Sequence, residues 1–546
     1  MILRRYSKKQ NIIVFMIIGV ILFLTSLPYL VGVFLAQDYI FLGGSHLNQG
    51  DVHVYLANIE QVKDGKFLTA NNFTSEIQKN VFFAPLWIIL GWVAKVFFLN
   101  SLLVFHLARI IAGLVFLYFL FYYFLDIFFA KFFNKLIAFI LICITSGLGL
   151  LFKPKIERLI FDDRTIFTNF SVDLVMPEAN VFLTLAHSAL FIFSQLIILL
   201  IFYFVLKNKF QKIELLYVFG FSLLLGFLHT YDVIIVAAVL AVYFLVQFAL
   251  NFFNKTQFAW QEYLQKVIVI LLGFVPALAY FYFVLRPEPT IWGWVEQNVI
   301  LSPPLRGYII AYLPLIVFSL LSLYLIRKKI LNKKIIFLLC WIITLFVLAY
   351  LPFTWQRKLI STVQIALGVL ATYGVVFLIK NIIKVYTHKV FGWLVVGILF
   401  VFISLSNLSF VVSTIYNYVN SNYVFYFPEN YYQAVLWYAK NSSDSQTILS
   451  SALNGTVIAG LTGQPVYMGH AHQTINYLEK RELLDNWFFK ANQQNEKKKE
   501  FLNKYNINYI YYSNREKELG NYNLEVIDWL EQVYDKDDVQ IYKVNF

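Results

Sequence analysis

The most reactive-looking side chains of the sequence lie in a polar stretch that begins at Gly50 and reads GDVHVYLANIEQVKDGKF. Asp51 precedes Tyr55 by four residues, so a helix would carry both side chains on one face. A second face would carry apolar residues at helical spacing, namely Val52, Leu56, Ile59 and Val62. A carboxylate at the beginning of such a helix can accept a proton as a general base, or it can simply cap the helix. We expect a helix that lies on the membrane surface, with Asp51 as the candidate base.

A second reactive group lies at the start of a later apolar run, where Gln356, Arg357 and Lys358 follow one another. A guanidinium can bind two phosphate oxygens at once, and basic pockets between membrane helices suit lipid head groups. The alternative is that Arg357 and Lys358 bind no ligand and only extend their charged ends to the membrane interface. The sequence predicts that these three residues bind a phosphate.

Four further side chains are candidates for substrate binding. His229 and Asp232 flank the short turn LHTYD between two apolar runs, where they would bind acceptor or phosphate, or only cap the helices. Glu178 begins the next outer helix, and His470 lies in the segment GHAHQT. No third metal ligand has a suitable spacing to His470 and His472, so no metal site is predicted, although a divalent metal cofactor is left open.

The composition defines the class of protein that must position these residues. Hydrophobic residues make up 60% of the 546 residues and charged residues 14%, whereas soluble proteins carry about 25% charged residues. This composition indicates a polytopic membrane protein. The two cysteines, Cys143 and Cys340, both fall inside apolar runs, which excludes a disulfide framework. The net charge of +13 is spread over short loops, where Lys and Arg act as topology signals, so nucleic acid is not an expected partner.

Eleven apolar runs predict about eleven transmembrane helices. They lie near residues 11–36, 102–125, 132–151, 180–206, 215–229, 232–250, 266–285, 308–326, 335–351, 358–379 and 391–416. A further run, 81–99, contains Pro85 and Lys95, and we expect it to lie in the outer interface. With this assignment the N-terminus and basic loops such as RKKILNKK are cytoplasmic, and loop 37–101 lies on the outer side.

The composition changes at about Val419. From there the chain alternates short apolar strands with amphipathic helices, which predicts an extracytoplasmic α/β domain with its own small core. The expected domains are therefore a transmembrane domain over residues 1–418 and an α/β domain over 419–546.

The region after the first apolar run resembles a known family. An Asp, a Tyr four residues later, an Ile and a Gly-containing turn are followed by FFAPLWIILGWVAKVFFLNSLLVFHLARIIAGLVFLYFL. Over residues 11–125 this pattern is similar to the GT-C superfamily of membrane glycosyltransferases, especially the branch of protein O-mannosyltransferases and lipid A aminoarabinose transferases. Asp51 matches the catalytic Asp of the family, and Pro85 and Leu86 match its Pro-Leu pair. Arg109 matches the Arg near the start of the family's next transmembrane helix. Two positions differ, because Val52 replaces an acidic residue and Phe83-Ala84 replaces a Lys.

The resemblance implies the reaction. It predicts transfer of a sugar, with inversion, from a polyprenyl-phosphate donor to a hydroxyl of a glycan, lipid or protein on the extracytoplasmic face of the plasma membrane of a prokaryote. Asp51 would be the base and Asp38 the second choice, Arg109 would orient the loop, and Tyr55 would contact substrate. A transporter or flippase of lipid-linked sugars is the main alternative. Transporters usually show repeat halves and helices broken by Gly or Pro at mid-membrane, whereas this sequence has no internal repeat and its polar groups lie at the outer boundary. A third possibility is a structural envelope protein whose C-terminal tail is a binding module. Only the pattern around Asp51 argues against it.

Overall fold

The structure is a computed structural model of the chain. It describes residues 6–545 except for residues 83, 153–156, 162–163, 208–210, 256–259, 387, 421–423, 444, 491–493 and 521. The chain forms two compact units. The helical unit comprises Met1–Pro28, Leu107–Tyr280 and Val299–Ser413, and the mixed unit comprises Tyr29–His106, Phe281–Asn298 and Thr414–Phe546.

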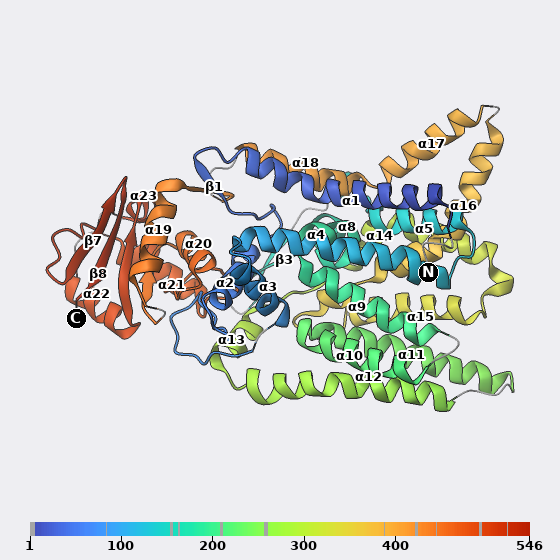
Figure 1. Cartoon of the computed structure of the whole chain (residues 1–546), viewed down its shortest axis with the longest axis horizontal. Helices are drawn as coiled ribbons and strands as arrows, with labels where there is room; N and C mark the ends of the chain where they lie inside the picture. The colour runs from blue at the N-terminus through green and yellow to red at the C-terminus, as the bar shows by residue number, and fades with distance from the viewer. Residues whose placement is uncertain are drawn as a thin grey trace. The chain divides into compact units, whose positions relative to one another are not determined.

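Most of the described chain is helical, and eight of the described helices are long and apolar enough to cross a membrane (Figure 1). They are α1 (Lys8–Phe34), Ser101–Ile127 with α4 (Ser101–Phe119), Phe132–Phe152 with α5 (Phe132–Ile144) and α6 (Gly149–Phe152), α9 (Ala189–Leu206), α11 (Tyr231–Phe253), Trp260–Leu285 with α12 (Trp260–Tyr280), α14 (Leu305–Leu325), and Gln356–Val385 with η7 (Gln356–Ile360) and α16 (Val363–Val385). The chain is therefore a multi-pass membrane protein, as its composition predicts.

The remaining three predicted crossings are also helical. A ninth span would combine α17 (Lys389–Phe402) and α18 (Leu405–Asn420), which are bent by 59°. α10 (Lys212–Leu228) and α15 (Lys333–Leu348) have 17 and 16 residues. At 1.5 Å per residue each of these two is about 25 Å long, slightly less than the roughly 30 Å hydrocarbon core. The total of eleven crossings thus stays a prediction.

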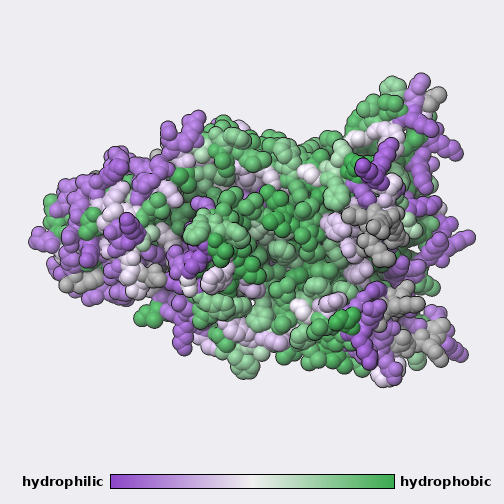
Figure 2. All heavy atoms as spheres, in the orientation of Figure 1, coloured by the Kyte–Doolittle hydropathy of each residue, from purple (hydrophilic) through white to green (hydrophobic). Residues whose placement is uncertain are grey.

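The helical unit also contains several short elements. They are η2 (Leu120–Phe124), η3 (Leu125–Ile127), β2 (Glu157–Phe161), β3 (Arg164–Thr168), α7 (Val172–Val175), η4 (Pro177–Ala179), α8 (Val181–His187) and η6 (Arg327–Lys329). β2 and β3 form an antiparallel hairpin. On the face that Figure 2 shows, hydrophobic side chains cover most of the long helices.

The N-terminal part of the mixed unit is built on two neighbouring helices, α2 (Gln49–Lys63) and α3 (Pro85–Val96). α3 has 12 residues and is about 18 Å long, which is too short to cross a bilayer. Gly91 of α3 lies so close to Val62 of α2 that a Cβ at this position would overlap the valine side chain. The glycine therefore permits close packing of the two helices.

The C-terminal part of the mixed unit is built on a four-stranded sheet with strand order β5-β6-β8-β7. The strands are β5 (Thr447–Leu449), β6 (Ile507–Tyr512), β7 (Leu530–Lys536) and β8 (Val539–Val544). β5 runs parallel to β6, and the other pairs are antiparallel. The accompanying helices are α19 (Glu429–Asn441), α20 (Ala452–Thr462), α21 (Tyr477–Leu483), η8 (Leu484–Phe488), α22 (Asn495–Lys504) and α23 (Asn514–Leu519). This arrangement confirms the expected α/β class.

Alternate residues of β6 and β8 enter two different cores, because successive side chains of a strand point to opposite faces. One core contains Tyr509, Tyr511, Val539 and Ile541 together with residues of α19 and α20. The other contains Ile510, Tyr512, Tyr542 and Val544 together with residues of η8 and α22. Both faces of the sheet are therefore covered.

The first of these cores also includes residues of the N-terminal loop, namely Leu42, Ala57 and Phe73. In addition, β1 (Tyr39–Phe41) pairs with β4 (Tyr426–Pro428) just before α19. η5 (Phe281–Leu285) and α13 (Pro289–Gln297) complete this unit. The C-terminal region and loop 37–101 thus fold together, while the domain boundary at 418/419 stays a prediction.

Candidate active site

Asp51 lies in the first turn of α2, as the third residue of the helix. The N-cap residue is Asn48, so Asp51 does not occupy the capping position that was its structural alternative. The partial positive charge at a helix N-terminus favours an ionised carboxylate there. The Asp51 side chain is 47% exposed, which leaves it accessible to a substrate hydroxyl.

His470 of the C-terminal region lies against this carboxylate. Its Nε2 atom is 3.3 Å from Oδ1 of Asp51, and its Nδ1 atom accepts a hydrogen bond of 3.3 Å from the backbone N–H of His472. A neutral imidazole has one donor and one acceptor nitrogen. Because Nδ1 is the acceptor, Nε2 carries the proton, and Nε2 lies within ion-pair distance of Asp51. Sequence analysis predicted His470 as a substrate-binding residue, whereas this contact with Asp51 comes from the structure alone.

Gly50 makes the contact possible. A Cβ atom at position 50 would lie 2.5 Å from Cδ2 and 2.9 Å from Nε2 of His470. Any larger residue would therefore displace the imidazole. Sequence analysis missed Gly50, although a glycine inside the first turn of a helix, where it lowers helix propensity, is a recognisable signal.

Tyr55, one turn after Asp51, belongs to an aromatic stack. Its ring centroid is 4.5 Å from that of Trp87 and 5.9 Å from that of Phe105, with interplanar angles of 20° in both pairs. Offset stacking of this kind stabilises the packing of the elements that carry the rings. Tyr55 thus fixes the position of α2 relative to α3 and the start of α4, and its contact with substrate stays a prediction.

Two other polar residues of the mixed unit have different environments. Asp38 is exposed in the turn between α1 and β1 and makes no hydrogen bond or ion pair to the described residues. His53 is buried against α20, where Gly460 provides the space for its ring. Burial, with a smaller contribution from His470, lowers the pKa of His53 to about 4. Of the two candidate bases, Asp51 is therefore the one whose carboxylate has a partner side chain, His470. His53 is a neutral residue of the core.

In the helical unit, Arg357 of η7 has an unused buried donor. Its Nε atom is buried and makes no hydrogen bond to the described residues. Its guanidinium carbon is 5.3 Å from the centroid of the Phe170 ring. Glu178 of η4 and Tyr308 of α14 are near enough to interact with it electrostatically. Buried N–H groups without a partner are rare, so this one is suited to an anionic ligand.

Lys358 lies close to the LHTYD turn. The sequence suggests these two features separately, and the structure brings them together. Nζ of Lys358 lies 4.5 Å from the centroid of the Tyr231 ring. Within the turn, Nδ1 of His229 is 2.9 Å from Oδ2 of Asp232, and the Ser194 hydroxyl donates to the same oxygen. Asp232 is buried, so these bonds hold the turn in place.

Two further predicted residues also lie in the helical unit. Gln356 begins η7, and its side chain makes no hydrogen bond to the described residues. Arg109 is buried in α4 and donates to the carbonyl oxygens of Leu185 (2.9 Å) and Thr25 (3.4 Å) and to the hydroxyl of Ser26 (3.0 Å). These bonds tie α4 to α1 and α8, and a role of Arg109 at the substrate stays a prediction.

Within the described ranges, no group of three or more His, Cys, Asp or Glu side chains could hold a metal ion. The rings of His470 and His472 have centroids 5.9 Å apart.

Comparison with solved structures shows that the chain is similar in fold to a known glycosyltransferase. The arabinofuranosyltransferase AftD from Mycobacteria has a TM-score of 0.50 at 10% identity, and the match covers 99% of this chain and 40% of AftD. Also similar are the oligosaccharyltransferase AglB from Archaeoglobus fulgidus, bound to an inhibitory peptide and a dolichol-phosphate, and ArnT from Cupriavidus metallidurans, bound to undecaprenyl phosphate.

The AglB match has a TM-score of 0.49 at 13% identity and covers 90% of this chain and 69% of AglB. The ArnT match has a TM-score of 0.43 at 13% identity and covers 96% of this chain and 98% of ArnT. No protein-family model and no curated protein sequence matches the chain.

Proposed function

We propose that the protein is a membrane glycosyltransferase that transfers a sugar from a polyprenyl-phosphate donor to an acceptor hydroxyl on the extracytoplasmic side. The observation that carries this proposal is the Asp51–His470 pair, an accessible carboxylate held by an imidazole at the beginning of α2. The likeness of the fold to that of AftD supports the same class of protein. The carriers bound to AglB and ArnT suggest the donor class for this chain.

The proposed step needs one base and no covalent intermediate. The acceptor oxygen attacks the anomeric carbon while the bond between that carbon and the phosphate oxygen breaks. Asp51 takes the proton of the acceptor hydroxyl, and polyprenyl phosphate leaves with the bonding electron pair. Attack opposite to the leaving group inverts the configuration at the anomeric carbon.

His470 has a positioning role in this step. Its Nε2 lies 3.3 Å from Oδ1 of Asp51, and the 47% exposure of the Asp51 side chain lets the acceptor hydroxyl reach the carboxylate. A fixed donor also orients the carboxylate before the substrate binds, which lowers the reorganisation needed in the transition state.

The developing negative charge on the phosphate calls for cationic or N–H donors. Arg357 offers a buried Nε–H that the described residues leave without a partner, and Lys358 adds a second cation beside Tyr231. We assign the phosphate-binding role to these residues, with Gln356, Glu178, His229 and Asp232 around them. In the predicted orientation the N-terminus is cytoplasmic and the mixed unit is extracytoplasmic, in the plasma membrane of a prokaryote.

The reconstituted protein provides the test of this function. Proteoliposomes containing wild-type protein and a panel of polyprenyl-phosphate sugars, with membrane extract as a source of acceptors, should release free polyprenyl phosphate and form a new glycosidic product. Transbilayer movement of the donor without release of its phosphate would identify a flippase and contradict the proposal.

A further inference from the structure

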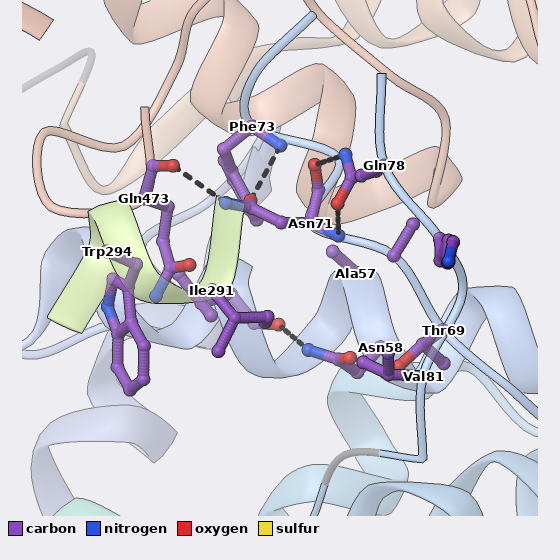
Figure 3. Close-up of a pocket in the computed structure, with 13 residues that line it drawn as sticks. Ala57, Asn58, Thr69, Asn71, Phe73, Gln78, Val81, Ile291, Trp294 and Gln473 are labelled. Atoms are coloured by element: carbon purple, nitrogen blue, oxygen red, sulfur yellow. Dashed lines mark hydrogen bonds between the residues drawn. The ribbon is translucent and has the colours of Figure 1, made fainter. Parts of the chain in front are cut away.

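A pocket in the mixed unit opens beside α2, with a cavity volume of about 40 Å³ (Figure 3). Its walls are Val54 and Asn58 of α2, the loop around Asn71, Trp294 of α13, and Gln473. Asn58 and Val81 lie on one side of the view, and Trp294 and Gln473 lie on the other. Neither the proposed base nor the phosphate-binding residues line this pocket.

The walls are held by a network of amide hydrogen bonds. Oε1 of Gln78 accepts from the backbone N–H of Asn71 (2.9 Å), and its Nε2 donates to the Asn71 carbonyl (2.7 Å). Nδ2 of Asn71 in turn donates to the carbonyl of Gln473 (2.7 Å). Gln297 attaches α13 to the same segment, because it donates to the Thr474 carbonyl and accepts from the Asn476 N–H, both at 3.0 Å. The pocket is therefore built before any ligand arrives.

Two other amides remain available for a ligand. The side-chain amide of Gln473 and Oδ1 of Asn58 make no hydrogen bond within the part of the chain that the structure describes. Nδ2 of Asn58 is bonded to the Val54 carbonyl (2.9 Å), which fixes the direction of Oδ1. An amide presents a donor and an acceptor together, which suits the vicinal hydroxyls of a sugar. Trp294 adds the apolar face of an indole to the lining.

The residues that line the pocket disfavour two other ligand classes. No carboxylate lines the pocket, and its single cation, Lys79, is exposed. A phosphate or other anion would need converging cations, and a lipid chain would need a lining that is apolar throughout. The chemistry that fits the lining is a neutral, polyhydroxylated molecule.

The pocket continues the face of α2 that carries Asp51. Asp51, Val54 and Asn58 are separated by three and four residues, so they form one stripe along the helix. Asn58 lies seven residues after Asp51, about 10 Å further along the helix axis. A ligand that fills the pocket and reaches the base must therefore be longer than one sugar ring.

We propose that this pocket is the acceptor subsite and that the acceptor is a neutral oligosaccharide, an inference that rests on the proposed role of Asp51. Gln473 and Asn58 bind hydroxyls of an inner sugar, Trp294 packs against its ring, and the next sugar presents its hydroxyl to Asp51. Among the acceptor classes that the sequence leaves open, we thus select the glycan.

Direct binding to the full-length protein in detergent tests the subsite independently of catalysis. The probes are neutral disaccharides of mannose, galactose and arabinose, measured by saturation-transfer NMR. We expect at least one to bind, with at least tenfold weaker binding in Trp294→Ala and Gln473→Ala and near-normal binding in Trp294→Phe. Trp92→Ala, which removes an indole that is 45% exposed and does not line the pocket, is the matched control.

Three further variants and readouts separate the outcomes. Asp51→Asn and Lys79→Ala should both keep saccharide binding. Absence of any Trp294-dependent saccharide binding, or loss of binding in Lys79→Ala alone, would overturn the subsite. If the wild type binds saccharide but transfers no sugar, the proposed function is contradicted. If transfer occurs and the acceptor KM is unchanged in Trp294→Ala, only the subsite is contradicted.

Discussion

The imidazole of His470 and the carboxylate of Asp51 lie 3.3 Å apart, although 418 positions separate them in the sequence. The orientation of the imidazole follows from the hydrogen bond that its other nitrogen accepts from His472. The pair joins the start of α2 to a loop of the C-terminal region, so the proposed base depends on both.

The first prediction concerns Gly50. In Gly50→Ala the new Cβ would meet the His470 ring at 2.5 Å, so the imidazole must move away from Asp51. We expect transfer to fall roughly 10- to 100-fold, because a polar contact with a charged group contributes about 1.5–3 kcal/mol. The thermal midpoint should change little if the ring can shift. Gly220→Ala, at a helix position with open space around it, is the control and should keep full activity.

The second prediction concerns His470 itself. His470→Ala should lower kcat by roughly 10- to 100-fold and leave the donor KM unchanged, because the residue orients the base without touching the donor. His470→Gln, which retains an N–H donor, should recover part of kcat. Equal kcat values in the two variants would rule out the positioning role.

The third prediction concerns Arg357 and the donor phosphate. Arg357→Ala should weaken binding of the polyprenyl-phosphate donor by roughly 10- to 100-fold, since a buried charge-assisted hydrogen bond is lost. Arg357→Lys should recover only part of the affinity, because an ammonium lacks the planar donor geometry. Arg306, bonded through Nε to Asn169 at 3.0 Å in the same unit, supplies the control Arg306→Lys. Equal donor affinity in wild type and Arg357→Ala would refute the assignment.

The fourth prediction concerns acid stability. The pKa of His53 is about 4 in the folded protein because of burial, against 6.5 for an exposed histidine. Between these values the unfolded chain binds more protons than the folded one, so stability rises with pH and is lost as the pH falls from about 6.5 to about 4. The loss from this one group is about 3 kcal/mol.

His46, whose pKa burial also lowers to about 4, contributes in the same direction. Thermal melts at pH 7 and pH 5 should therefore differ less in His53→Leu than in wild type. An identical pH dependence in the two proteins would show that His53 does not cause it.

Sequence reasoning could predict the features that depend on local pattern. The apolar runs predicted the membrane helices, and helical spacing after Gly50 predicted α2, which begins at Gln49, two residues before Asp51. The change of composition near Val419 predicted the α/β region. Each of these signals is contained in a short window of the chain.

The contacts between distant segments could not be predicted in this way. Nothing in the spacing of GHAHQT shows that His470 meets Asp51, and nothing in the loop 37–101 shows that Phe73 enters the core under the sheet. Likewise, Lys358 and Tyr231 lie in separate apolar runs and meet only through tertiary packing. Such pairings depend on the path of the whole chain.

Single-turnover transfer by Asp51→Asn tests the central claim most directly. The variant, wild type and the exposed-site control Asp38→Asn are each saturated with the same polyprenyl-phosphate sugar, and donor binding is measured in parallel. We predict that Asp51→Asn binds donor like wild type but transfers sugar at least about 100-fold more slowly, because it lacks the base, while Asp38→Asn keeps its rate. Transfer by Asp51→Asn at the wild-type rate would contradict the account.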